Sequence, residues 1–177
     1  MNININDIFE FSQLRITCHV RSLNYFAAMF GLNFPDHDGD KNKEPMRTGY
    51  AYIVYAMYHK NFHLTPEHEK LCEEAKETHH KHATHHIAYY QNISDIPDIR
   101  IYEMVSDWAS ANFEQKEILC ANDALGLIDW FNKNRLNENW TAHQLDLIQK
   151  AFKIIDEKSD SGVIKSIWMP VLEKSDL

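Results

Sequence analysis

Histidines are concentrated in one stretch of the chain, residues 78–86, which has the sequence THHKHATHH. The stretch contains five of the eleven histidines: His79, His80, His82, His85 and His86. Imidazole is the most common metal ligand among side chains and titrates near neutral pH. If the stretch is helical, His79, His82 and His86 share one face, and His80 points about 100° away from His79. Taken alone, the tract is compatible with a metal site, with a solvated polar turn and with adventitious metal binding.

Other segments supply side chains of the same ligand types: His19, the adjacent pair His37-Asp38, and Asp107. His19 lies on the same side of a predicted helix as Leu23 and Phe26, so we expect it to point inward. A single inward histidine is more often a hydrogen-bonded core residue than a ligand. Asp107 borders the apolar side of its own predicted helix, and a half-buried carboxylate needs a partner. That partner could be a metal ion, or Arg100 or another basic group.

Most of these side chains are expected to lie on helices, because apolar residues around them recur at helical spacing. The predicted helices cover residues 7–30, 46–58, 65 into the histidine tract, 94 to 111, 121–134 and 141–156. Asp7, Thr65, Ser94 or Asp95, and Thr141 are the expected N-caps, and Gly31 is the expected C-cap of the first helix. Residues 33–45, which contain the His37-Asp38 pair, are rich in Pro, Gly, Asn and Asp and predict a loop or a short helical turn.

These elements predict an all-α, single-domain helical bundle of about six to seven helices. Residues 46–58 could also form a buried strand, but the lack of a partner strand favours a helix. We expect residues 1–157 to form the domain. Residues 158–177 are a C-terminal tail that is either a short packed helix or a docking segment.

Composition and charge narrow the classes of function. The formal net charge is −8, from 18 basic and 26 acidic residues, which disfavours long nucleic acid as a partner. The three cysteines are far apart and form no CxxC pair, which is typical of a reducing cytosol. We see no signal peptide, and no apolar run approaches the roughly 18 residues of a membrane span. We therefore expect a cytoplasmic protein, for which a homodimer is compatible with the sequence.

The candidate ligands follow the order H … HD … HH … D along the chain. In an all-α chain, this order resembles the HD-domain superfamily of metal-dependent phosphohydrolases. The resemblance implies a helical bundle that presents these side chains to one or two divalent ions. Residues 37–41, HDGDK, also match an HDxxK pattern, like the HDxGK of the HD-GYP branch, whose lysine approaches the substrate phosphate. No GYP sequence follows, which weakens any implication of specificity for cyclic dinucleotides.

The chain is more closely similar to an uncharacterised family of small bacterial and phage proteins with HDxSK, HHxHRNxHH and EMxxDW motifs. The corresponding segments here are HDGDK (37–41), HHKHATHH (79–86) and EMVSDW (103–108). The similarity covers roughly residues 19–130. Asp40 replaces the usual serine and places a carboxylate where a phosphate could sit. The histidine tract is one residue shorter than the motif, so the roles of His85 and His86 stay open.

The resemblance and the ligand chemistry together suggest roles for individual residues. The predicted ligands of a first ion are His19, His37, Asp38 and Asp107, with Asp38 anchoring or bridging, and His79 and His80 are expected to add a second ion. The predicted catalytic residues are Asp38, Lys41 and Glu103. The predicted substrate-binding residues are Arg15, Lys41, His82 and His86. Glu103 or His82 could alternatively orient a ligand or transfer a proton.

A set of imidazole and carboxylate ligands favours Mn, Fe, Co, Ni or Zn over Mg. Such an ion lowers the pKa of a bound water and offsets charge on phosphoryl oxygens. We therefore predict a metal-dependent phosphohydrolase that acts on a small phosphorylated compound, preferably a nucleotide, as a monoesterase or a diesterase. A non-catalytic, metal-stabilised helical binding module is the alternative, favoured by Asp40 and the shortened tract. A purely structural helical protein with solvated histidines ranks last.

Overall fold

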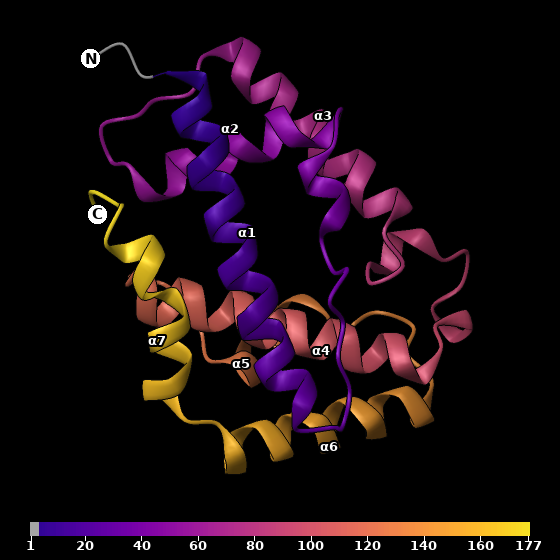
Figure 1. The fold of residues 1–177 in the computed structure, drawn as a ribbon. Coiled ribbons are helices and arrows are strands. Elements are labelled where there is room, and N and C mark those ends of the chain that lie inside the picture. Colours follow the sequence, from indigo (N-terminus) through magenta and orange to yellow (C-terminus); the bar gives the residue numbers. More distant parts are fainter. Residues whose placement is uncertain (1–3) are drawn as a thin grey trace.

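The chain folds into helices joined by loops and short helical turns (Figure 1). A computed structural model describes residues 4–177, and this part of the chain forms seven α-helices and no β-sheet. The helices are α1 (Ile5–Ala28), α2 (Met46–Tyr58), α3 (Pro66–His82), α4 (Asp98–Phe113), α5 (Leu127–Asn134), α6 (Ala142–Lys158) and α7 (Ser161–Leu172). The short turns are η1 (Gly39–Asn42), η2 (Ile87–Tyr89), η3 (Ile93–Asp95) and the π-helical turn η4 (Glu114–Ile118). The predicted all-α, single-domain class is confirmed.

Several helix ends lie where the capping residues predict them. The Thr65 hydroxyl accepts the backbone N–H of His68 at the start of α3, and Thr141 caps α6 in the same way. In both cases the side chain three residues on completes a capping box. At the other end of α1 the C-cap is Met29, so the predicted C-cap, Gly31, lies two residues beyond it. Gly31 has a φ of +73°, a left-handed conformation that glycine adopts without steric cost.

Three predicted helix starts are wrong. The side chain of Asn4, and not that of Asp7, caps α1. Helix α4 begins at Asp98, after the predicted caps at 94 and 95, because Pro97 is extended and a proline drives the residue before it away from the helical region. Helix α5 begins at Leu127 and not at residue 121, because the backbone at Gly126 is extended.

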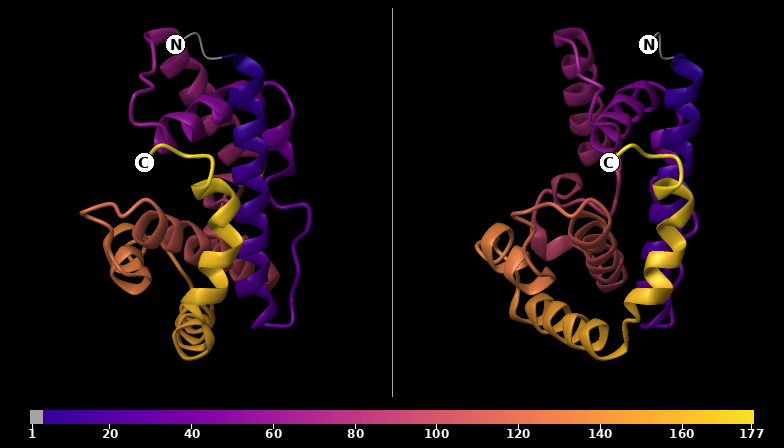
Figure 2. Two further views of the ribbon diagram at one scale, coloured as in Figure 1. Left: turned by 60° about the vertical axis from the view of Figure 1, so that its left-hand side comes forward. Right: turned by 90° about the vertical axis from the view of Figure 1, so that its left-hand side faces the viewer.

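Helix α1 is the element against which three others pack. It contacts α2, α4 and α7, and it lies alongside α7 in all three ribbon views (Figures 1 and 2). Helices α2 and α3 pack at one end of the molecule, and α4, α5 and α6 form the other end. The α2–α3 approach needs Gly49, since a Cβ there would lie 2.3 Å from the backbone oxygen of Leu71. No helix in the described part of the chain is long and apolar enough to cross a membrane.

The C-terminal segment is a packed helix, which decides between the two alternatives that the sequence left open. Trp168 of α7 is fully buried, and its ring centroid lies 6.4 Å from that of His19 on α1. Helix α7 thus covers the side of α1 that carries a candidate ligand.

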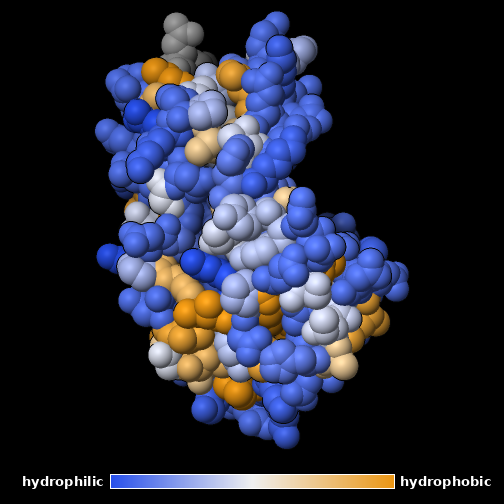
Figure 3. Space-filling model, turned by 90° about the vertical axis from the view of Figure 1, so that its right-hand side faces the viewer, coloured by the Kyte–Doolittle hydropathy of each residue, from blue (hydrophilic) through white to orange (hydrophobic). Residues whose placement is uncertain are grey.

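Figure 3 shows one face of the molecule, with a mainly hydrophilic upper part and hydrophobic groups gathered in its lower part.

Candidate metal centre

Asp38 lies at the centre of a buried cluster of histidines. Its Oδ1 atom lies close to three imidazole Nε2 atoms: 3.7 Å from that of His37, 3.3 Å from that of His79 and 3.6 Å from that of His85. None of these four atoms has a hydrogen-bond partner within residues 4–177. Buried polar atoms nearly always have a partner, so four unpaired atoms that converge on one point indicate a site for a bound group. Lone pairs on nitrogen and oxygen are what a divalent cation requires.

Carboxylates hold two of these imidazoles from the outside. The Nδ1 atom of His37 lies 3.0 Å from Oε1 of Glu103, and Nδ1 of His79 lies 2.8 Å from Oδ2 of Asp40. A carboxylate that accepts the Nδ1 proton fixes the ring and turns the Nε2 lone pair toward the centre, as is common for metal-binding histidines. Asp40 therefore has a role that the sequence did not suggest.

A second group of ligands lies on the other side of Asp38. The Nε2 atom of His19 lies 2.9 Å from Oδ1 of Asp107, and Nε2 of His37 lies 3.6 Å from the same oxygen. The other side-chain oxygen of Asp38, Oδ2, lies 3.8 Å from Nε2 of His19. The Ser110 hydroxyl lies 3.1 Å from Nδ1 of His19 and orients that ring. The two oxygens of Asp38 thus face two groups of ligands.

Each of these groups could hold a metal ion. Four sets of residues place their ligand atoms within 4.8 Å of one another: His37, Asp38 and His85; His19, His37 and Asp107; His79, His85 and His86; and Asp38, Asp40 and His79. Most of these side chains are buried. The sets overlap, since His37, Asp38, His79 and His85 each belong to two of them. The cluster is therefore one continuous centre and not four separate sites.

The backbone at Asp38 is constrained. Its φ is +61°, in the left-handed region that residues other than glycine rarely adopt, and the residue is only 2% exposed. Such strain persists only where the surroundings hold it, and it is concentrated at functional sites. The conformation turns the carboxylate of this loop residue into the helical bundle, toward the imidazoles of α1 and α3.

Proton affinities in the cluster follow its charges. Burial lowers the pKa of His37, but Asp38, Asp107 and Glu103 outweigh burial and raise that pKa to about 10. Burial raises the pKa of Asp38, but Lys41 and His37 outweigh it and hold that pKa well below its usual range. The pKa of Asp107 is likewise held well below its usual range, against burial, by its neighbours His19 and His37. The carboxylates are therefore ionised at neutral pH, which is the form that binds cations.

Most of the predicted ligands meet in this centre. His19, His37, Asp38, His79 and Asp107 all contribute atoms to it, although they come from α1, the 33–45 loop, α3 and α4. This convergence is the geometry that the order of ligands along the chain suggested.

The histidine tract is not one continuous helix, and this changes which of its members face the centre. His80 is exposed, since α3 turns it away from His79. His85 faces Asp38 instead: α3 ends at His82, and the extended backbone at Ala83 lets the chain turn back. Sequence reasoning missed this role of His85, although a helix end inside the tract was the signal that could have found it.

The other two histidines of the tract, His82 and His86, differ in burial. His82 is exposed, and its Nδ1 lies 2.7 Å from the backbone oxygen of Thr78. The ring of His86 lies 4.5 Å from that of His85, and its Nε2 is buried without a partner. Burial, with a smaller contribution from His85, lowers the pKa of His86 to about 2, so this ring is neutral and able to bind a metal.

Lys41 and Arg15, both predicted to bind phosphate, already have carboxylate partners. The Lys41 Nζ atom lies 2.8 Å from Oδ2 of Asp38, at the edge of the cluster. The guanidinium of Arg15 makes two hydrogen bonds with Glu114, one of 2.8 Å from Nε, and the Tyr58 hydroxyl donates a third, of 2.7 Å, to the same carboxylate. The side chains of Arg15 and Glu114 are almost entirely buried. Arg15 is thus occupied by a structural ion pair that sequence reasoning did not identify.

A cleft of about 730 Å³ opens beside the cluster. His37, Asp38, His85 and Glu103 form one part of its wall, and Phe34, Pro35, Pro45 and Met46 form an apolar part. His82 and Arg100 also line it. The volume is within the range of small-molecule sites. The cleft gives a small ligand access to the cluster.

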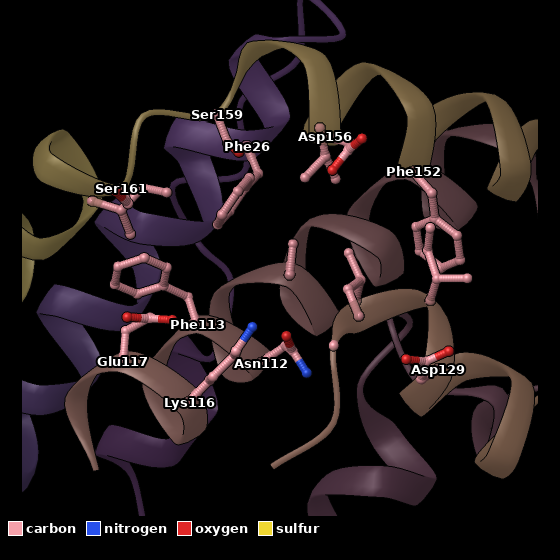
Figure 4. A pocket seen from close by; sticks show the side chains of 16 residues that line it. Phe26, Asn112, Phe113, Lys116, Glu117, Asp129, Phe152, Asp156, Ser159 and Ser161 are labelled. Atoms are coloured by element: carbon pink, nitrogen blue, oxygen red, sulfur yellow. The ribbon is translucent and has the colours of Figure 1, made fainter. Parts of the chain in front are cut away.

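A second cavity, of about 650 Å³, lies elsewhere (Figure 4). Phe26, Phe113 and Phe152 provide aromatic walls, and Lys116 and Glu117 lie at one side. No histidine lines this cavity within the described residues, so it is separate from the metal centre.

The fold and the site together define an all-α protein with a buried histidine–carboxylate cluster that could hold a metal ion. The chain matches the family of unknown function DUF5662 over residues 9–158 and belongs to that family. The match includes all the ligands of the cluster and extends to the end of α6. Searches of the curated proteins and of the solved structures gave no match.

Proposed function

We propose that this protein is a metal-dependent hydrolase of a small phosphorylated compound, and that nucleotides are the first class of substrate to test. The observation that carries the proposal is the convergence of three unpaired Nε2 atoms on the unpaired Oδ1 of Asp38. The order of these ligands along the chain, with its resemblance to the HD-domain superfamily, supplies the class of reaction.

The ligand set favours Mn, Fe, Co, Ni or Zn over Mg, because most of the converging atoms are imidazole nitrogens. We propose one or two ions per chain, with Asp38 directing one oxygen to each group of ligands. A bound ion would lower the pKa of a water molecule to near neutral and offset charge on a phosphoryl oxygen.

The chain's own residues would hold and orient these partners. Glu103 fixes the His37 ring through Nδ1, and Asp40 fixes the His79 ring. Lys41 contacts the predicted ligand Asp38 directly, and this hydrogen bond keeps a basic side chain at the edge of the centre. Glu103 also lines the cleft, and we propose that it accepts a proton from an attacking water.

The size of the cleft and the charge of the chain both favour a small substrate. A cleft of about 730 Å³ suits a nucleotide-sized molecule better than a polymer. A net charge of −8 opposes binding to a long phosphate backbone.

The binding-module alternative loses part of its basis in this geometry. Asp40 suggested a degenerate site when it was compared with the usual serine. Its contact with Nδ1 of His79 gives it a role in an intact site. The shortened tract still delivers His85 to the centre.

Protein that carries no histidine tag is screened with Mn²⁺ or Co²⁺ against nucleotides, other phosphomonoesters and phosphodiesters. Asp38→Ala is the test variant, and Glu44→Gln, which removes an exposed carboxylate of the same loop that does not line the cleft, is the matched control. We expect metal-dependent hydrolysis that Asp38→Ala abolishes and Glu44→Gln largely retains. Hydrolysis that survives Asp38→Ala unchanged would contradict the mechanism. Metal binding without hydrolysis of any compound in the screen would favour the binding module.

A further inference from the structure

Arg100, which no motif of the sequence singles out as a binding residue, is the cation best placed to contact an anion in the cleft. We infer that its guanidinium binds the phosphate group of the ligand that occupies this cleft. The inference rests on the proposed function for the choice of phosphate. Its geometric basis is independent of any catalysis.

Arg100 lies in the first turn of α4 and lines the same cleft as His37, Asp38 and His85. Among the described residues of this lining, it is the only arginine or lysine. A guanidinium presents five N–H donors in a planar fork that matches two phosphate oxygens at once. The cleft therefore has one built-in group with the shape and charge for an oxyanion.

The position of Arg100 is fixed relative to the metal centre. Its Nη1 donates a hydrogen bond to Oε2 of Glu103, whose other oxygen, Oε1, lies 3.0 Å from Nδ1 of His37. One carboxylate thus links the guanidinium to a metal ligand. The bond to Glu103 is the only side-chain hydrogen bond that the guanidinium makes within residues 4–177, and 36% of the side chain is exposed. The remaining donors are available to a ligand.

The other cations near the centre are less available. Arg15 is buried against Glu114, and Lys41 is bound to Asp38 and does not line the cleft. The cleft is also lined by four carboxylates, which repel anions: Asp36, Asp38, Asp40 and Glu103. An anionic ligand in this cleft therefore needs a positive side chain besides any bound metal, and Arg100 supplies it.

The test measures binding of inorganic phosphate and, separately, of pyrophosphate to the Mn²⁺-loaded protein by isothermal titration calorimetry. The variant is Arg100→Gln. The matched control is Arg135→Gln, since Arg135 also pairs with a glutamate three residues on, is similarly exposed at 38%, and does not line the cleft. The Mn²⁺ content of every sample is measured first, so that loss of metal is not mistaken for loss of phosphate binding.

We expect Arg100→Gln to weaken phosphate binding roughly tenfold to a hundredfold, as for the loss of a charged hydrogen-bond donor, with unchanged Mn²⁺ content. Arg135→Gln should bind phosphate as the wild type does. Equal affinities for Arg100→Gln and wild type would overturn the inference, as would the absence of phosphate binding by the loaded wild-type protein.

The failure of this inference can be told apart from failure of the proposed function. Phosphate binding that depends on Arg100, in a protein that hydrolyses no compound of the screen, would support the inference and contradict the hydrolase. Metal-dependent hydrolysis with the same KM in Arg100→Gln and wild type would support the hydrolase and overturn the inference.

Discussion

Removing the carboxylate of Asp40 should weaken metal binding without removing a predicted ligand. Its Oδ2 lies 2.8 Å from Nδ1 of His79, whose Nε2 faces Asp38. Loss of such an outer partner typically costs 10–100-fold in metal affinity, which is about 1.4 to 2.7 kcal/mol. Because 32% of the Asp40 side chain is exposed, solvent screens its charge, and we expect Asp40→Ala to lie near the lower figure.

The assay is a competition titration of Co²⁺ between a chelator and untagged protein from which metal has been removed. Asp40→Asn should lose less affinity than Asp40→Ala, since the amide oxygen can still accept the Nδ1 proton of His79. Asp36→Ala, which removes an exposed acid of the same loop, is the control and should bind Co²⁺ nearly as wild type does. Equal affinities for Asp40→Ala and Asp36→Ala would refute the orienting role of Asp40.

Two further predictions concern the buried ion pair and the protons of the cluster. Arg15→Met should lower the free energy of unfolding by about 3–5 kcal/mol, because it leaves the buried carboxylate of Glu114 without its cation. Urea unfolding measures this, Arg15→Met/Glu114→Gln should recover part of the loss, and an unchanged midpoint for the single variant would show that the pair is not structural. Metal binding at pH 7.5 should release protons, because the pKa of His37 in the metal-free cluster is about 10 and a ligand imidazole must be neutral. Affinity should then fall as the pH falls from about 8 to 6, since protons compete with the metal for the imidazoles. Calorimetry in buffers of different ionisation enthalpy counts the protons, and binding without release would contradict a protonated His37.

The fold could be predicted from the sequence because its signals are local. The apolar spacing of α1 and the threonine caps of α3 and α6 act over a few residues, and the structure has these elements as expected. The predicted starts of α4 and α5 are wrong because the backbone at Pro97 and at Gly126 is extended, so each helix begins only after that residue.

The types of ligand were also predictable, but their partners were not. His79 and Asp40 are 39 residues apart, and Arg15 and Glu114 are 99 residues apart. A local sequence pattern cannot predict such contacts, because they depend on how α1 and α3 pack against the segments that carry Glu114 and Asp40. The role of His85 depends on the turn after His82, where the extended Ala83 ends the helix inside a tract of good ligands.

Titration of Co²⁺ into untagged, metal-free protein tests most directly whether the imidazoles around Asp38 bind a divalent ion. Wild type, His85→Ala and His80→Ala are compared. His85→Ala should lose more affinity than the roughly 10–100-fold expected for an outer partner, because its Nε2 lies 3.6 Å from Oδ1 of Asp38. His80→Ala should bind as wild type does, because His80 is exposed and outside the cluster. A wild-type protein that binds no Co²⁺, or a loss with His80→Ala that exceeds the loss with His85→Ala, would contradict such binding.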